Sequence, residues 1–540
     1  MPPDTSASRI LMTIAPISCD SLKRLVDGDK GYALLDAREP GEYNAGHIPG
    51  ATSLPRRDIE FRIRDLIPVR DTSVVIVGDG KQRENLAAAT MSSVGYRNVQ
   101  LLTGGVPAWS QAGYSLATGI NLPSKEFGEK IHLECEVPEI EPQDLRTRLQ
   151  RGDDLLIFDA RTPAEYGHFC IPGGLNLPGG DLVLWAEELK KNPRTTVVIN
   201  CAGRTRSIIG TQTLRRLGLS NVVALRNGTM GWLLAGLDLE CHPNRRPWTP
   251  SDNSRAATEE LAAKIAKEET IPYASITELR DLLNQRDQKT LYPIDVRSSE
   301  EYLAGHIPGF LSVPGGQAVQ RADDYIAVGT GTIVFTCDRT ARATMAAYWY
   351  RKMGFKNACA LEGGIEGWAN GGHELEIGQA VKPPLGIERA HSLVSFISCQ
   401  ELALWLTTSK NLLLLDVGLS AEYEQGHLPG SAWISRGWLE ERIPQLYPDR
   451  QEPIAVVCPN GQQSTLAGAA LTELGYSNVC IVEGGTRSWQ DEGRPLETGL
   501  TKPLVAPNDI VLSTSMTGDK SAMRRYLDWE LRLGDRYKNR

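Results

Sequence analysis

Long apolar runs, a basic charge balance and paired cysteines are all missing from this chain of 540 residues. No apolar run approaches the roughly 20 residues that a membrane helix needs, which argues against a spanning protein. The formal net charge is −8, so nothing favours a nucleic-acid surface. No Cys-x-x-Cys pair occurs among the 10 cysteines, which argues against a disulfide scaffold and against a Cys/His metal site.

A secretory leader is not visible either. Met1–Pro16 has neither a basic start with a long apolar core nor a cleavage pattern. We therefore expect a cytoplasmic protein whose thiols are reduced, and a function that needs no membrane, nucleic acid, metal or cofactor.

One sequence pattern recurs four times along the chain. In each copy an apolar strand ends in Asp, a Glu-Tyr pair follows, and an Ile/Leu-Pro-Gly turn comes next. A loop position lies 42 residues after that Asp, and a Trp lies 31 residues after the loop position. The four sets are Asp36, Gly78 and Trp109; Asp159, Cys201 and Trp232; Asp295, Cys337 and Trp368; Asp416, Cys458 and Trp489. This constant spacing predicts four tandem modules.

Strands alternate with helices inside each copy, which predicts an α/β fold with a mostly parallel sheet and helices on both faces. Sites are expected at the carboxyl ends of the strands. We place the modules at 1–120, 131–243, 270–378 and 392–500, and a tail with a helix that docks on the protein at 501–540. Linkers fall near 118–130, 243–270 and 379–391. The middle linker is the longest and carries a helix over 255–264, which suggests two pairs of modules.

Cys201 is the strongest candidate for chemistry. Val197–Ile199 predicts a short buried strand and Thr205–Gly210 predicts the start of a helix, so Cys201 lies on a tight strand-to-helix loop. Inward backbone N–H groups, the positive end of the helix, Arg204 and Arg206 all favour the thiolate, which is the nucleophile.

The other three loops differ from this one. The first, Gly78–Arg83, has no thiol, so we expect a structural or binding module. The third keeps Cys337 with Arg339 and Arg342, but Asp338 raises the expected thiol pKa. The fourth has Cys458 without any Arg, and Gly418 replaces the Arg that follows the strand-end Asp elsewhere. We expect activity mainly at Cys201, then at Cys337, with Cys458 a weaker site, a relay or a vestige.

These motifs together resemble the rhodanese family, in four copies that cover nearly the whole chain. They are Asp-x-Arg, Glu-Tyr-x-x-Gly-His-Ile-Pro-Gly, Cys-x-x-x-x-Arg and Gly-Gly-x-x-x-Trp. The resemblance implies a sulfurtransferase whose loop Cys accepts a sulfane sulfur as a persulfide and passes it to cyanide or a thiol, including a protein acceptor. It implies catalytic roles for Cys201, Cys337 and Cys458. The residues expected to bind substrate are Ala202, Gly203, Arg204, Thr205, Arg206, Arg339 and Arg342.

Thiosulfate is the expected donor, because two cations flank Cys201 and the Cys-Gly-x-Gly-Val-Thr pattern of mercaptopyruvate enzymes is absent. Asp159, Arg161 and Glu165 are expected to be structural, as ion-paired neighbours of the loop. Two alternatives stay open. One is a Cys-dependent phosphatase, whose loop in related proteins is one residue longer. The other is a scaffold of rhodanese modules that binds partners or relays sulfur.

Overall fold

The computed structural model describes residues 14–28, 30–408 and 411–538. Residues 1–13 of the first expected module and 539–540 of the tail lie outside this description. Within it, each of the four modules contains a five-stranded sheet with the same strand order, which in the first module is β1-β5-β4-β2-β3. The pairs within these sheets are parallel, and β8 and β12 form a small antiparallel pair beside the second sheet.

The strands are short. Those of the first module are β1 (Ala15–Ile17), β2 (Ala33–Asp36), β3 (Thr52–Ser53), β4 (Val74–Val77) and β5 (Val99–Leu102). Those of the second are β6 (Glu139–Ile140), β7 (Leu155–Asp159), β8 (Phe169–Cys170), β9 (Leu175–Asn176), β10 (Thr196–Asn200), β11 (Val222–Leu225) and β12 (Glu240–Cys241). Those of the third are β13 (Tyr273–Ala274), β14 (Leu291–Asp295), β15 (Leu311–Ser312), β16 (Thr332–Thr336) and β17 (Ala358–Leu361). Those of the fourth are β18 (Ser395–Ile397), β19 (Leu413–Asp416), β20 (Ala432–Trp433), β21 (Ile454–Val457) and β22 (Val479–Val482).

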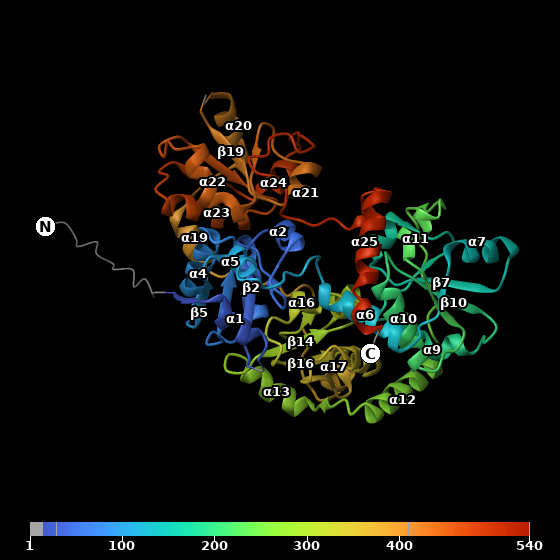
Figure 1. The fold of residues 1–540 in the computed structure, drawn as a ribbon. Helices are drawn as coiled ribbons and strands as arrows, with labels where there is room; N and C mark the ends of the chain where they lie inside the picture. Colours follow the sequence, from blue (N-terminus) through green and yellow to red (C-terminus); the bar gives the residue numbers. More distant parts are fainter. Residues whose placement is uncertain (1–13, 29, 409–410, 539–540) are drawn as a thin grey trace. The chain divides into compact units, whose positions relative to one another are not determined.

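The helices follow the strands in the same rhythm (Figure 1). In the first two modules they are α1 (Cys19–Val26), α2 (Pro40–Ala45), α3 (Ile59–Leu66), α4 (Arg83–Ser93), α5 (Gly105–Gln111), α6 (Leu122–Glu134), α7 (Pro142–Arg151), α8 (Pro163–His168), α9 (Leu182–Lys190), α10 (Thr205–Arg216) and α11 (Gly228–Leu234). Next come α12 (Asp252–Glu268), α13 (Ile276–Asn284), α14 (Ser299–Ala304), α15 (Gly315–Gln320), α16 (Ala322–Tyr325), α17 (Ala341–Lys352) and α18 (Gly364–Asn370). The last are α19 (Ile387–Leu393), α20 (Cys399–Thr408), α21 (Ser420–Gln425), α22 (Arg436–Leu446), α23 (Gln462–Glu473), α24 (Gly485–Asp491) and α25 (Lys520–Arg532).

Helices cover both faces of the sheet, as the second module illustrates. Val198 of the central strand β10 packs in one core cluster with residues of α7 and α11. The next residue, Ile199, points to the opposite face, where it lies against Gly210 of α10. This two-sided burial explains why the central strands are continuous apolar runs rather than alternating patterns.

The register of β10 sets the position of the site. Ile199 pairs with Phe158 of β7 on one side and with Ala224 of β11 on the other. Since the three strands are parallel, their carboxyl ends meet at one edge of the sheet. Asp159, at the end of β7, is therefore the neighbour of Asn200, the residue before Cys201.

The modules associate in two compact units. One unit contains residues 1–120 and 382–511, which are the first and fourth modules, and the other contains 121–381 and 512–540, which are the second and third modules with the tail. The modules do form two pairs, but the longest linker lies within a pair, because it joins the second module to the third. In that linker, α12 contains the expected helix over 255–264. The linker expected at 118–130 is largely helical, because Phe127 and Ile131 give α6 an apolar face that is buried.

No helix in the ranges described is long and apolar enough to span a bilayer.

Candidate active site

Cys201 follows β10 at the carboxyl edge of its sheet, and its side chain is only 2% exposed. Its carbonyl oxygen accepts the backbone N–H of Thr229 at 2.8 Å, and the Ala202 carbonyl accepts that of Met230 at 3.1 Å. A β-carbon on Gly228 would lie 2.2 Å from the Cys201 carbonyl oxygen, so only glycine allows this close approach. The first turn of α11 thus fixes the loop from behind.

The thiol itself lies at the N-terminal end of a helix. α10 has 12 residues and begins at Thr205. The Cys201 thiol donates to Ser207 Oγ at 3.5 Å, and the Ser207 hydroxyl donates to the Arg204 carbonyl at 2.8 Å. The positive end of the helix favours the thiolate at this position.

Both arginines of the loop are held by carboxylates. Arg204 Nε donates to Glu129 Oε1 at 2.5 Å, and its Nη1 donates to Glu139 Oε1 at 3.0 Å. Arg206 donates to both oxygens of Glu165, each at 2.7 Å. The guanidinium groups therefore act on the loop as members of ion pairs, and their expected contact with a sulfonate stays a prediction. Glu129 and Glu139 could not be predicted as partners of Arg204 from the sequence, because neither belongs to a recurring motif.

Asp159 and Arg161 form the second ion pair beside the loop. Arg161 Nε and Nη2 donate to the two oxygens of Asp159 at 2.9 and 2.7 Å, and both side chains are buried. Asn200 also donates to Asp159 at 3.1 Å. Arg206 keeps the pKa of Glu165 low, at about 2, against the effect of burial. The structural role expected for Asp159, Arg161 and Glu165 stays a prediction.

Cys337 lies in the same place in the third module, surrounded by carboxylates. Arg342 pairs with Glu301 at 2.6 Å, with Asp338 at 3.0 Å and with Asp181 of the second module at 2.8 Å. Burial and then the Asp338 charge raise the pKa of the Cys337 thiol well above its ordinary value. The expected effect of Asp338 is thus present, and burial is the larger cause.

The linker helix α12 covers the Cys337 loop. Its Glu259 accepts the backbone N–H of Thr340 at 3.1 Å, and its Arg255 pairs with Asp338. Arg339, expected to bind substrate, is half exposed and pairs with Glu366 at 3.0 Å. Of the two arginines in this loop, only Arg342 is buried beside the thiol.

Cys458 has a different surrounding, in the unit formed by the first and fourth modules. Its sulfur accepts the backbone N–H of Ser464 at 3.3 Å, and burial raises its thiol pKa. Gly418 replaces the arginine that elsewhere pairs with the strand-end Asp, and burial raises the pKa of Asp416 to about 7. The Trp433 indole, fully buried, donates to the Gly418 carbonyl at 3.0 Å.

The loop of the first module, Gly78–Arg83, has no thiol and no room for one. A β-carbon on Gly78 would lie 2.2 Å from Oε2 of Glu84, the first-turn residue of α4 that corresponds to Ser207 in the second module. The Glu84 carboxylate is buried, and burial raises its pKa. Arg83 keeps the ion pair with Glu42, at 2.6 Å. A carboxylate thus fills the space where the other three modules hold a sulfur.

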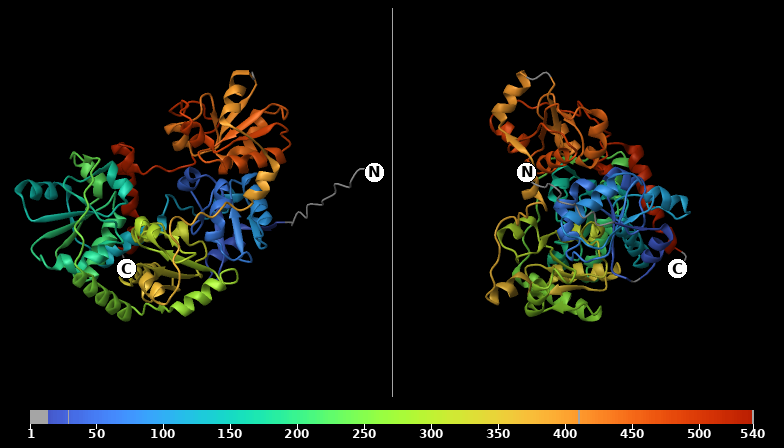
Figure 2. Two further views of the ribbon diagram at one scale, coloured as in Figure 1. Left: turned by 180° about the vertical axis from the view of Figure 1, so that it is seen from behind. Right: turned by 90° about the vertical axis from the view of Figure 1, so that its left-hand side faces the viewer.

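The tail helix α25 packs on the second module, beside α6 and α11 (Figures 1 and 2). It also reaches the Cys201 loop. Met523 and Leu527 are buried against Met230 of α11. Glu530 Oε1 accepts the Thr205 hydroxyl at 2.9 Å. The sequence predicted a docked tail helix, but it did not indicate that Glu530 lies at the loop, because an exposed-looking acidic residue in a tail carries no pattern.

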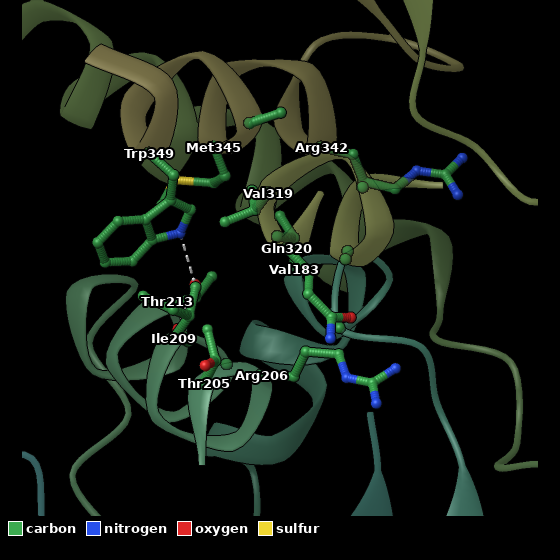
Figure 3. A pocket seen from close by; sticks show the side chains of 16 residues that line it. Val183, Thr205, Arg206, Ile209, Thr213, Val319, Gln320, Arg342, Met345 and Trp349 are labelled. Atoms are coloured by element: carbon green, nitrogen blue, oxygen red, sulfur yellow. Dashed lines mark hydrogen bonds between the residues drawn. The ribbon is translucent and has the colours of Figure 1, made fainter. Parts of the chain in front are cut away.

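A cavity lies between the second and third modules, beside both loops (Figure 3). The modules meet through two glycine pairs, and a β-carbon on Gly180 would lie 2.8 Å from Gly315 Cα. In Figure 3 Trp349 donates its indole N–H to Thr213 Oγ1, at 2.9 Å, on one side of the cavity. Arg206 and Arg342 extend toward the other side. The lining is otherwise mostly apolar and includes Val183, Ile209, Val319 and Met345.

The first and fourth modules meet through ion-paired arginines at the equivalent positions. Arg56 and Arg436 stand where the second and third modules have the first glycine of each pair, 20 residues after the strand-end Asp. Arg436 pairs with Glu60 at 2.5 Å, and Arg56 pairs with Glu440 at 2.9 Å. Buried ion pairs thus stand in this unit at the positions where the other unit has glycines.

The comparison with known proteins finds one family in each of the four repeats. The family described as Rhodanese-like domain matches residues 18–112, 141–235, 275–371 and 398–492. The chain belongs to the rhodanese family. Its fold superposes with a TM-score of 0.90 on the crystal structure of a thiosulfate sulfurtransferase from Pseudomonas aeruginosa, with 34% sequence identity over 97% of each chain.

Shorter rhodanese relatives match single modules. One is a sulfurtransferase of Allochromatium vinosum, 35% identical over 103 residues, which are 19% of this chain and 94% of the relative. Another is the thiosulfate:glutathione sulfurtransferase of Saccharomyces cerevisiae, 31% identical over 121 residues, 20% of this chain and 86% of the relative. The chain spans about half, 52%, of the Bacillus subtilis protein YrkF, with 32% identity over 98 residues and 18% of this chain.

Proposed function

We propose that this rhodanese is a sulfurtransferase that moves a sulfane sulfur from thiosulfate to a thiol or to cyanide, mainly through a persulfide on Cys201. The observation that carries the proposal is the position of Cys201, on a short strand-to-helix loop at the N-terminal end of α10. The similarity of the whole chain to the thiosulfate sulfurtransferase of Pseudomonas aeruginosa supports it.

The chemistry has two half-reactions. The Cys201 thiolate attacks the outer sulfur of thiosulfate, the sulfur–sulfur bond of thiosulfate breaks, and sulfite leaves with the electron pair. The persulfide carries its charge on the outer sulfur, where backbone N–H groups of the loop can stabilise it. An acceptor nucleophile then attacks that outer sulfur and returns the electron pair to Cys201. This is covalent, ping-pong catalysis.

Cys201 ranks first among the three thiols because of the charges around it. The Cys337 loop carries Asp338 next to the thiol, and both burial and that charge raise the thiol pKa. The Cys458 loop has no arginine, and burial raises the pKa of its thiol as well. A thiol with a raised pKa is a weaker nucleophile at neutral pH because less of it is ionised. We also place the reaction in the cytoplasm, where thiols stay reduced.

Cyanolysis after thiosulfate exposure tests the ranking. We expect Cys201→Ser to lose most thiocyanate formation, and Cys337→Ser and Cys458→Ser to keep most of it. Full activity in Cys201→Ser would show that the ranking is wrong. Phosphotyrosine mimics offered in parallel test the phosphatase alternative, and we expect no turnover because Arg206 stands only five positions after Cys201.

A scaffold role is favoured for the first module alone. Its loop has glycine in place of cysteine, and the Glu84 carboxylate occupies the space of a thiol. This module can hold the fourth one through the buried ion pairs of Arg56 and Arg436 without taking part in sulfur transfer.

A further inference from the structure

Two helices outside the recurring modules cover the Cys201 loop. They are α6, in the linker before the second module, and α25, in the tail, and both belong to the same unit as Cys201. A β-carbon on Gly203 would lie 3.2 Å from Glu530 Oε2 and 3.7 Å from Tyr526 Cε1. On the α6 side, a β-carbon on Gly128 would lie 3.1 Å from the methyl group of Thr205. The loop also hydrogen-bonds to both helices, through Thr205 to Glu530 of α25 and through Arg204 to Glu129 of α6.

Glu530 of α25 has hydrogen-bonding capacity that the described residues do not use. It is only 1% exposed. Its Oε1 accepts the Thr205 hydroxyl at 2.9 Å, whereas its Oε2, which faces Gly203, has no hydrogen-bond partner among the residues described. A buried carboxylate oxygen without a donor is costly, so a bound molecule that brings a proton to this point is favoured.

The charges around Glu530 allow it to exchange a proton. Lys125 and Glu129 of α6 and Arg204 of the loop are its charged neighbours. Lys125 lies over the rings of Tyr526 and Trp529, 5.1 and 5.0 Å from their centroids. Burial raises the pKa of Glu530, and Lys125 opposes that effect. A carboxylate with a raised pKa is a stronger base than one in water.

We propose that Glu530 is a further catalytic residue, which accepts the proton of an acceptor thiol in the second half-reaction. The inference rests on the proposed function. The thiol S–H bond breaks and its proton goes to Glu530 Oε2, while the thiolate attacks the outer sulfur of the Cys201 persulfide. The sulfur–sulfur bond breaks, its electron pair returns to Cys201, and Glu530 passes its proton to the persulfide product. No oxidant or reductant is required.

Two acceptors separate this role from a structural one. The test uses the full-length chain carrying Cys337→Ser and Cys458→Ser, loaded with thiosulfate and then freed of excess donor. An alkyl thiol must lose its proton at neutral pH, whereas a nitrothiophenolate is already ionised. We expect Glu530→Gln to load sulfur on Cys201 normally and to discharge it to the alkyl thiol about 10²-fold more slowly. Discharge to the nitrothiophenolate is expected to stay within about threefold, since no base is needed.

Two control variants address the position of α25. Glu530→Gln can still accept the Thr205 hydroxyl through its amide oxygen. Met523→Ala loosens the packing of α25 without changing charge, and we expect it to affect both acceptors alike. Glu530→Asp keeps a carboxylate and is expected to recover part of the rate with the alkyl thiol.

The outcomes separate the inference from the function on which it rests. Equal slowing of both acceptors in Glu530→Gln, or loss of sulfur loading in that variant alone, would overturn the role of Glu530. Absence of loading in the chain with unaltered Glu530 would overturn the proposed function instead.

Discussion

Replacing Asp416 with asparagine tests why the fourth module differs from the other three. In those modules a buried arginine pairs with the strand-end aspartate, as Arg297 pairs with Asp295 at 2.7 Å. Gly418 removes that partner, and the Asp416 carboxylate accepts the Gly418 backbone N–H at 2.8 Å. Burial then raises the pKa of Asp416 from 3.8 to about 7.

The sign and size of the effect follow from this shift. The folded chain binds the Asp416 proton more tightly than the unfolded chain, so the free energy of unfolding falls as pH rises from 3.8 to about 7. A shift of about three units corresponds to about 4 kcal/mol lost above that range. Asparagine keeps an oxygen for the Gly418 N–H and cannot ionise. We therefore expect Asp416→Asn to stabilise the fourth module by up to about 4 kcal/mol at about pH 8.5 and by little at about pH 4.

Hydrogen exchange of peptides that contain β19 and β21, measured along a urea titration, reports the stability of this module in the full chain. Asp295→Asn is the matched control, because it leaves buried Arg297 without its carboxylate and should destabilise the third module at neutral pH. A gain in Asp416→Asn that is the same at both pH values would refute the argument, since it would show that Asp416 ionises without penalty.

Three further predictions concern the other loops. Gly78→Cys is expected to form no persulfide in the first module, because the new side chain overlaps Glu84. The double variant Gly78→Cys with Glu84→Ser removes that overlap, and its new cysteine should gain the mass of one sulfur atom on thiosulfate treatment. Alkylation of Cys337 in the native chain should accelerate as pH rises above its ordinary thiol range, and Asp338→Asn should accelerate it several-fold at neutral pH; an unchanged rate would contradict the electrostatic argument. Arg204→Gln leaves a buried carboxylate of α6 without its cation and should cost about 3–5 kcal/mol, seen as faster hydrogen exchange in α6.

The repeated architecture was predictable from sequence because it depends on local patterns. Apolar strands that end in Asp recur at a fixed distance from the loop, so the position of Cys201 at a strand end follows from spacing alone. The fold is the expected α/β arrangement of four tandem rhodanese domains. The short loop and the Asp159–Arg161 pair lie within one module, where close positions in sequence stay close in space.

The surroundings of the loops were not predictable, because they come from segments that carry no recurring motif. Glu129 in a presumed linker and Glu530 in the tail reach the Cys201 loop only after helices α6 and α25 dock. Which modules pair also depends on their surfaces. The second and third modules meet through glycine pairs, whereas the first and fourth have ion-paired arginines at the equivalent positions. The sequence also could not predict that the Glu84 side chain fills the thiol position of the first loop. That depends on how close Glu84 lies to Gly78 in the folded module.

The most direct test of the account is to locate the transferred sulfur. The full-length chain is treated with thiosulfate, alkylated without reduction and digested, and each cysteine peptide is examined by mass spectrometry. The account predicts the added mass of one sulfur atom chiefly on the peptide that contains Cys201, and its loss after cyanide. A sulfur found only on Cys337 or Cys458, or on no cysteine, would contradict it.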